Sequence, residues 1–110
     1  MAYDLDLAER IRELLMPLDG VEEKAMFGGL AFLINGNMSV AASGQGGLLA
    51  RVSPQDADKL LQHDTVNPMV MRGREARGWL RVDAEAVRTR RQLQSWVTRS
   101  VDYVRGLPPK

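Results

Sequence analysis

Residues 26–38 read MFGGLAFLINGNM, and this segment decides the fold that the sequence predicts. The apolar run over residues 24–34 holds too many glycines for a helix, so it predicts a β-strand. Asn35-Gly36 follows this run, and the pair tolerates the positive φ angles of a tight hairpin turn. Residues 38–42 are therefore expected to return antiparallel as a second strand.

Helices are predicted near both ends of the chain. The first is expected over residues 6–17, where Asp6 can cap the first turn and apolar residues recur at helical spacing. The last is expected over residues 84–105, with Asp83 as its N-cap. Its inner stripe consists of Leu93, Val97, Val101 and Val104. The tail over residues 106–110 is expected to end this helix and to fray.

Shorter elements lie between the hairpin and the last helix. Further strands are expected over residues 48–52, 69–71 and 78–82. Ser53 precedes Pro54 and is expected to cap a short helix over residues 54–62. An arginine-rich turn over residues 72–77 is expected to separate the last two strands.

These elements predict a single α+β domain over residues 1–110, in the order α-β-β-β-α-β-β-α. Strands that follow one another through short turns imply a mainly antiparallel sheet. We therefore expect about five strands and three helices, with the helices covering one face of the sheet.

The composition excludes several classes of site. The chain has 110 residues, 45% of them hydrophobic and 26% charged, which suits one globular domain. It contains no cysteine, so disulfides, thiolate metal sites and cysteine nucleophiles are ruled out. No apolar run is long enough to cross a membrane, and the acidic start is unlike a signal peptide. The expected location is the cytoplasm, without a cofactor or bound metal.

The segment that begins Met26-Phe27-Gly28-Gly29 and continues through Asn35-Gly36 resembles the N-terminal domain of the TfoX/Sxy family. The leading helix, the third strand and the closing amphipathic helix with Trp96 follow the same pattern over nearly the whole chain. The resemblance implies a domain of the kind found in bacterial regulators of natural competence, which act with a cyclic-AMP-responsive transcription activator. Those regulators carry a second, C-terminal domain beyond this one.

Most motifs that suggest chemistry have a structural interpretation. Gly28-Gly29 is expected to mark a bulge or a helix packed closely on the sheet. The SGQGG segment over residues 43–47 precedes a strand rather than a helix, so a flexible connection is expected instead of a phosphate-binding loop. His63 is the only histidine, and with Asp64 alone beside it neither a catalytic set nor a zinc site is expected.

The arginines are the best candidates for binding a partner or an anion. Residues 1–64 are net acidic and residues 65–110 net basic. Such a split can mark a surface for an anionic partner, but the preferred interpretation is that the two halves neutralise each other on folding or that solvated helix faces differ in sign. The candidates are Arg72, Arg74, Arg77, Arg81, Arg88 and Arg91.

The sequence therefore favours a non-catalytic interaction domain, and the family resemblance implies a link to transcription regulation through a protein partner. That partner is expected at the arginine-rich region or at an exposed sheet edge. Nucleic-acid binding through the same arginines is the first alternative. It ranks behind a protein partner because few aromatic residues are available to stack bases. A small enzyme with an unlocated site is the second alternative. An open sheet edge could also support a two-fold homodimer.

Overall fold

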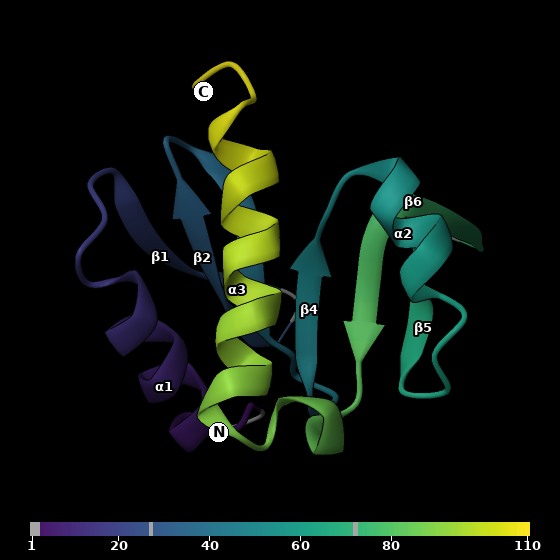
Figure 1. The fold of residues 1–110 in the computed structure, drawn as a ribbon. Coiled ribbons are helices and arrows are strands. Elements are labelled where there is room, and N and C mark those ends of the chain that lie inside the picture. Colours follow the sequence, from purple (N-terminus) through teal and green to yellow (C-terminus); the bar gives the residue numbers. More distant parts are fainter. Residues whose placement is uncertain (1–2, 27, 72) are drawn as a thin grey trace.

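One antiparallel sheet of six strands forms the centre of the fold, and the computed structural model describes residues 3–26, 28–71 and 73–110. The elements are α1 (Leu5–Leu15), β1 (Val21–Met26), β2 (Gly29–Ile34), β3 (Asn37–Ala42), β4 (Leu48–Arg51), α2 (Pro54–Leu60), β5 (Val66–Met71), β6 (Arg74–Val82), a 3₁₀ turn (Ala84–Val87) and α3 (Arg90–Arg105). The helices lie on one side of the sheet (Figure 1). The predicted α+β class is confirmed, with six strands instead of about five.

The strand order in the sheet is β1-β2-β3-β4-β6-β5, so β1 and β5 are its two edges. The extra strand arises because the run over residues 24–34 is not one strand. It divides into the end of β1 and all of β2, which pair antiparallel from Val21–Ile34 to Met26–Gly29. Gly28 turns the chain between them with φ of 76°, a conformation that side chains rarely adopt. Phe27 of the motif lies outside the described residues.

Gly29 is required by a close approach between two strands. A β-carbon built on it would lie 2.3 Å from the carbonyl oxygen of Ala42 in β3. The Gly28-Gly29 pair thus serves a turn and a strand contact, and neither the expected bulge nor a helix seat. At the next turn, Asn35 and Gly36 both have positive φ angles, 53° and 85°, as the tight hairpin requires.

The main core lies between the helices and the sheet. α1 and α3 lie side by side across the strands and contact each other (Figure 1). α1 buries Leu7, Ala8, Ile11 and Leu15, and α3 buries Leu93, Trp96, Val97, Val101 and Val104. The sheet contributes alternate residues such as Phe32, Val40 and Leu80, each no more than 1% exposed. The predicted stripe of the last helix is therefore a core stripe.

Both long helices begin at a different residue from the one predicted. Asp4, not Asp6, caps α1, and its carboxylate accepts from the backbone N–H of Asp6 at 2.9 Å. Asp83 makes no side-chain cap, and the chain after it forms a 3₁₀ turn. α3 starts only after Thr89, because a capping box with Gln92 satisfies the first-turn N–H groups there. Ser53 caps α2 as predicted.

The arginine-rich segment is a strand, not the predicted turn. β6 begins at Arg74, which pairs with Met71, and Glu75 pairs with Val70. The pairing is irregular between Pro68 and Val70. Residues 74–77 are mostly charged and exposed, so this half of β6 lacks the apolar alternation that predicted a strand over residues 78–82. Arg72 lies outside the described residues.

A β-bulge in β3 carries the only hydrogen-bonded side-chain pair that is buried in the described part of the core. Phe32 pairs with Val40 but Leu33 pairs with Met38, so Ser39 is the extra residue of the bulge. Its hydroxyl lies 2.7 Å from that of Ser100 in α3, and the Ser100 hydroxyl donates to the Ser39 carbonyl at 2.9 Å. Both serines are fully buried, so the bulge and the helix fix each other's position.

The tail does not fray as expected but docks on the β2–β3 turn. The backbone N–H of Lys110 donates to the carbonyl of Asn35 at 2.8 Å. The side-chain amide of Asn37 donates to the carbonyl of Pro108 at 2.9 Å. Among the described residues, no helix is long and apolar enough to span a membrane.

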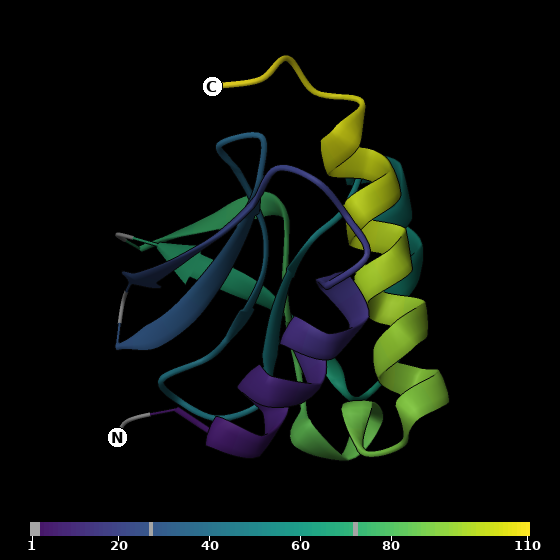
Figure 2. The same cartoon turned by 90° about the vertical axis from the view of Figure 1, so that its left-hand side faces the viewer.

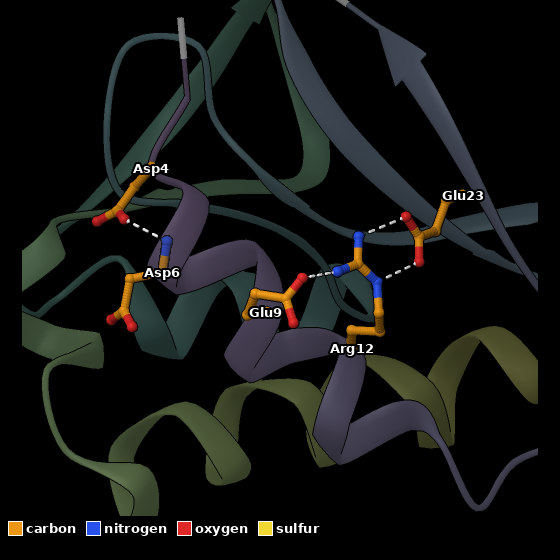
Figure 3. A network of polar contacts seen from close by, with 5 residues as sticks. All are labelled: Asp4, Asp6, Glu9, Arg12 and Glu23. Atoms are coloured by element: carbon orange, nitrogen blue, oxygen red, sulfur yellow. Dashed lines mark hydrogen bonds and ion pairs between the residues drawn. The ribbon is translucent and has the colours of Figure 1, made fainter. Parts of the chain in front are cut away.

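Arg12 joins α1 to the edge strand β1 (Figure 3). Its guanidinium donates to both carboxylate oxygens of Glu23, at 2.6 and 2.7 Å, and also pairs with Glu9 in the preceding turn. This bidentate contact holds the pKa of Glu23 below its usual range, because the hydrogen bonds from Arg12 favour the charged carboxylate.

The serine pair predicts a coupled effect on stability. Ser100→Ala should lower the free energy of unfolding by about 1–3 kcal/mol, because the buried Ser39 hydroxyl loses its partner. The double variant Ser39→Ala/Ser100→Ala should lose less than the sum of the two single variants, since no unsatisfied hydroxyl remains. Chemical denaturation of the four proteins measures this coupling. Strictly additive losses would show that the hydroxyls do not interact.

The Arg12–Glu23 contact predicts a shift in titration. In Arg12→Gln the pKa of Glu23 should rise toward that of an ordinary glutamate. Because the folded-state pKa is the lower one, the contact stabilises the fold above the unfolded-state pKa, and this stabilisation is lost as the pH falls through the folded-state pKa. Carbon-detected NMR titration of the Glu23 carboxyl measures the shift. Arg105→Gln, a matched change in an exposed part of α3, should leave the Glu23 pKa where it is.

Candidate functional site

A second cluster of apolar side chains lies on the sheet face that the helices leave open. Its buried members are Ala31, Met38, Ala41 and Leu49, and Met26, Leu33, Met69 and Trp79 pack around them. These residues alternate along the strands with those of the main core, so they point to the opposite side of the sheet. Trp79 is also covered by the guanidinium of Arg51, 5.1 Å from the ring centre.

The sheet curls around this cluster. Figure 2 shows the β1–β2 and β5–β6 hairpins projecting to the same side, away from α3. Between them lies a shallow hollow of about 100 Å³ that is open to solvent, here called the open-face hollow. Met26 and Gly29 line it from one hairpin, and Met69, Val70 and Arg81 from the other. Met38, Ala41 and Leu49 form its floor.

The connection between β3 and β4 forms one end of the open-face hollow. Ser43 and Gly47 are joined by a backbone hydrogen bond of 3.0 Å, and the Ser43 hydroxyl accepts from the N–H of Gln45 at 3.1 Å. Gly46 and Gly47 both have positive φ angles, 90° and 73°, which lets this loop turn tightly. The loop predicted to be a flexible connection is therefore a hydrogen-bonded turn, and Ser43, Gly44 and Gln45 face the hollow.

The described lining of the open-face hollow is mostly apolar, and its one charged side chain is positive. Three methionines line it, and their unbranched, polarisable side chains adapt to differently shaped apolar groups. Arg81 is the charged residue among its described lining residues. Such a surface fits an apolar side chain with a carboxylate close by.

The predicted arginines that the structure describes do not come together on one surface. Arg81 lies on the open face, whereas Arg91 lies on α3, on the helical side of the sheet. Arg74 and Arg77 are exposed near the β5–β6 turn, and Arg77 contacts Asp58 of α2 at 3.3 Å. Arg88 is exposed just before α3. Of the five candidates that the structure describes, Arg81 alone lines the open-face hollow, and a binding role for any of the candidates stays a prediction.

A larger and more open hollow of about 380 Å³ on the helical side contains Arg91 and the single histidine. His63 and Arg91 line it together with Ser95, Trp96 and Arg99. The guanidinium of Arg99 lies over the Trp96 ring, 5.0 Å from its centre. Asp64 does not line this hollow, and neither does any other carboxylate of the described chain. Within residues 3–26, 28–71 and 73–110, no group of three or more potential metal ligands is found.

Four residues of the open-face hollow were not predicted as binding residues from the sequence: Met26, Met38, Leu49 and Met69. The available signal was that β2 and β3 read as nearly continuous apolar runs, GLAFLI and NMSVAA, without polar alternation. A strand of this kind is buried on both faces, whereas the predicted helices cover only one. The second face therefore had to present apolar residues.

Comparison with known proteins supports the resemblance seen in the sequence. The family model of the TfoX N-terminal domain matches residues 13–104, from the first helix to the end of α3. The chain belongs to this family. No curated protein and no solved structure matched it.

Proposed function

We propose that this chain is a non-catalytic binding domain that engages a protein partner through the open-face hollow. The observation that carries the proposal is an apolar, methionine-lined surface that no helix covers, with Arg81 at its side. At the rim of the hollow Val70 is 60% exposed, and Met26 and Met69 are half-buried. Apolar side chains that gather within reach of solvent on a soluble protein commonly mark an interaction site. In a family of this kind, the partner would belong to transcription regulation.

The chemistry of the hollow describes the partner. An apolar side chain inserts among Met26, Met38 and Met69, and a neighbouring carboxylate pairs with Arg81. The arginine then adds orientation to an otherwise apolar contact, because an ion pair in a partly desolvated site is directional. Met26 and Met69 stand on opposite hairpins, so one inserted side chain would contact both.

The test is affinity capture of the tagged protein from its own cells, with and without nuclease. Met69→Lys puts a charge into the hollow and should lower the recovery of a specific partner about tenfold or more. Arg81→Gln should lower it too, and more strongly at low salt than at high salt. The recovered partner, once purified, should bind the wild-type domain directly in a calorimetric titration.

Matched changes on the helical side provide the controls. Met16→Lys alters an exposed methionine at the end of α1, and Arg91→Gln alters an exposed arginine of α3. Both should leave capture unchanged. If instead capture depends on nucleic acid, falls steeply with salt and is lost in Arg91→Gln, the domain binds nucleic acid through its helical side, and the open-face proposal is wrong.

A further inference from the structure

The free edge of β1 has the charge pattern and backbone orientation needed to pair with a second copy of itself. β1 lies at the end of the sheet, and Glu22, Glu23, Lys24 and Ala25 are exposed. An open edge presents unpaired N–H and C=O groups that another strand can use. We propose that this edge is a homodimer interface, in which two copies join antiparallel across a two-fold axis.

The existing hydrogen bonds determine which residues face outward. The N–H of Asn35 donates to the carbonyl of Gly20 at 2.9 Å, so these two residues form a hydrogen-bonded pair. In an antiparallel ladder such pairs alternate with non-bonded ones. Following the β1–β2 register, Glu22 and Lys24 use their backbone groups on β2. The backbone groups of Val21, Glu23 and Ala25 therefore point away from the sheet.

Only some registers are compatible with this orientation. Residues whose backbone groups point away from the sheet must pair with one another across the two copies. A slip by one position would break this match and would also exchange the two faces of the sheet on which the side chains lie. One allowed register centres on Glu23 and pairs Val21 with Ala25 of the second copy. The neighbouring registers centre on residue 22 or on residue 24 and place the identical residue of each copy at the axis.

Charge selects among these registers. In the register centred on Glu23, Glu22 stands opposite Lys24 of the second copy, twice by symmetry. These are non-hydrogen-bonded positions, where side chains on opposite strands are closest. The two neighbouring registers would instead oppose Glu22 to Glu22 or Lys24 to Lys24. The edge is thus complementary to itself in one register and repulsive in the adjacent ones.

The register centred on Glu23 leaves one like-charge contact, between the Glu23 side chains of the two copies, and Arg12 of each copy offsets it. Glu23 meets Glu23 of the second copy at the axis, on the helical side of the sheet. Each carboxylate already accepts two hydrogen bonds from its own Arg12, at 2.6 and 2.7 Å (Figure 3). The cation close to each Glu23 offsets the repulsion between the two carboxylates. The network that joins α1 to β1 therefore also prepares the edge for pairing.

Apolar surface at the same edge adds to the contact. A hollow between α1 and β1 is lined by Met16, Leu18 and Val21, and Met16 is 73% exposed. In the proposed register, the exposed Ala25 of the second copy stands opposite Val21, beside this hollow. The two sheets would continue as one, and each β1 would lose its free edge.

The test measures the mass of the full chain by sedimentation equilibrium over micromolar to millimolar concentrations. Wild type should associate to a dimer. Lys24→Glu and Glu22→Lys each replace both opposite-charge pairs by like-charge ones, so each should weaken the dimer about tenfold. The double variant Glu22→Lys/Lys24→Glu has the wild-type net charge and should restore dimerisation. A mixture of the two single variants should form a mixed dimer more tightly than either alone.

Matched charge changes elsewhere separate the edge from general electrostatics. Lys59→Glu and Glu85→Lys alter exposed residues of α2 and the 3₁₀ turn, and should leave the dimer unchanged, alone or mixed. Circular dichroism confirms that every variant is folded. A wild type that stays monomeric over the whole range would overturn the proposal. A dimer that the edge variants leave intact, or that the double variant fails to restore, would do the same.

Discussion

The hydrogen bonds between Ser39 and Ser100 hold the arrangement on which both faces of the sheet depend. Without a bulge, Met38, Val40 and Ala42 would share one face of β3, because strand side chains alternate strictly. The extra residue Ser39 breaks that alternation, so Val40 enters the helix-covered core while Met38 points to the open face. The Ser100 hydroxyl in α3 forms hydrogen bonds with the hydroxyl and the carbonyl of Ser39 at the bulge. One polar contact in the core thus decides which residues reach the open-face hollow.

Close backbone packing has a comparable effect at the other end of β2. Gly29 lies so near the Ala42 carbonyl that no side chain fits between them. This approach and the turn at Gly28 bring the β1–β2 hairpin to the rim of the hollow, opposite Met69. The motif that carries the family resemblance therefore shapes a surface rather than supplying chemical groups.

Much of the fold could be predicted from local patterns. Short local segments determine three of its features: the helical stripe that includes Val97 and Val101, the Asn35-Gly36 turn and the Ser53 cap. Each of these could therefore be predicted from the sequence. The errors came from choices between neighbouring signals. Thr89 with Gln92 outcompeted Asp83 as a helix start, since a capping box satisfies two groups at once. The second half of β6 was predicted as the strand over residues 78–82, but its first half was missed because residues 74–77 are mostly charged and show no apolar alternation.

The candidate site was harder to predict from the sequence than the fold, because its residues come together only when the strands form the sheet. Arg74 and Arg81 lie close in sequence, yet only Arg81 of the two lines the open-face hollow, and Arg91 lies on the helical side of the sheet. Closeness along the chain says little about a shared surface when a sheet separates the positions. Met26 and Met69 are far apart in sequence and face each other only because the sheet curls. Neither fact follows from composition or spacing.

The nearly sequential strand order also sets an order of folding events. Most strands pair with a neighbour in sequence, so their loops close at little entropic cost, and the meander of β1 to β4 can form early. Ser39 and Ser100 are separated by 61 residues, and α3 follows all six strands in the chain, so it leaves the ribosome after them. During synthesis the bulge therefore exists for a time without its partner, and arrival of α3 is the step that closes the core.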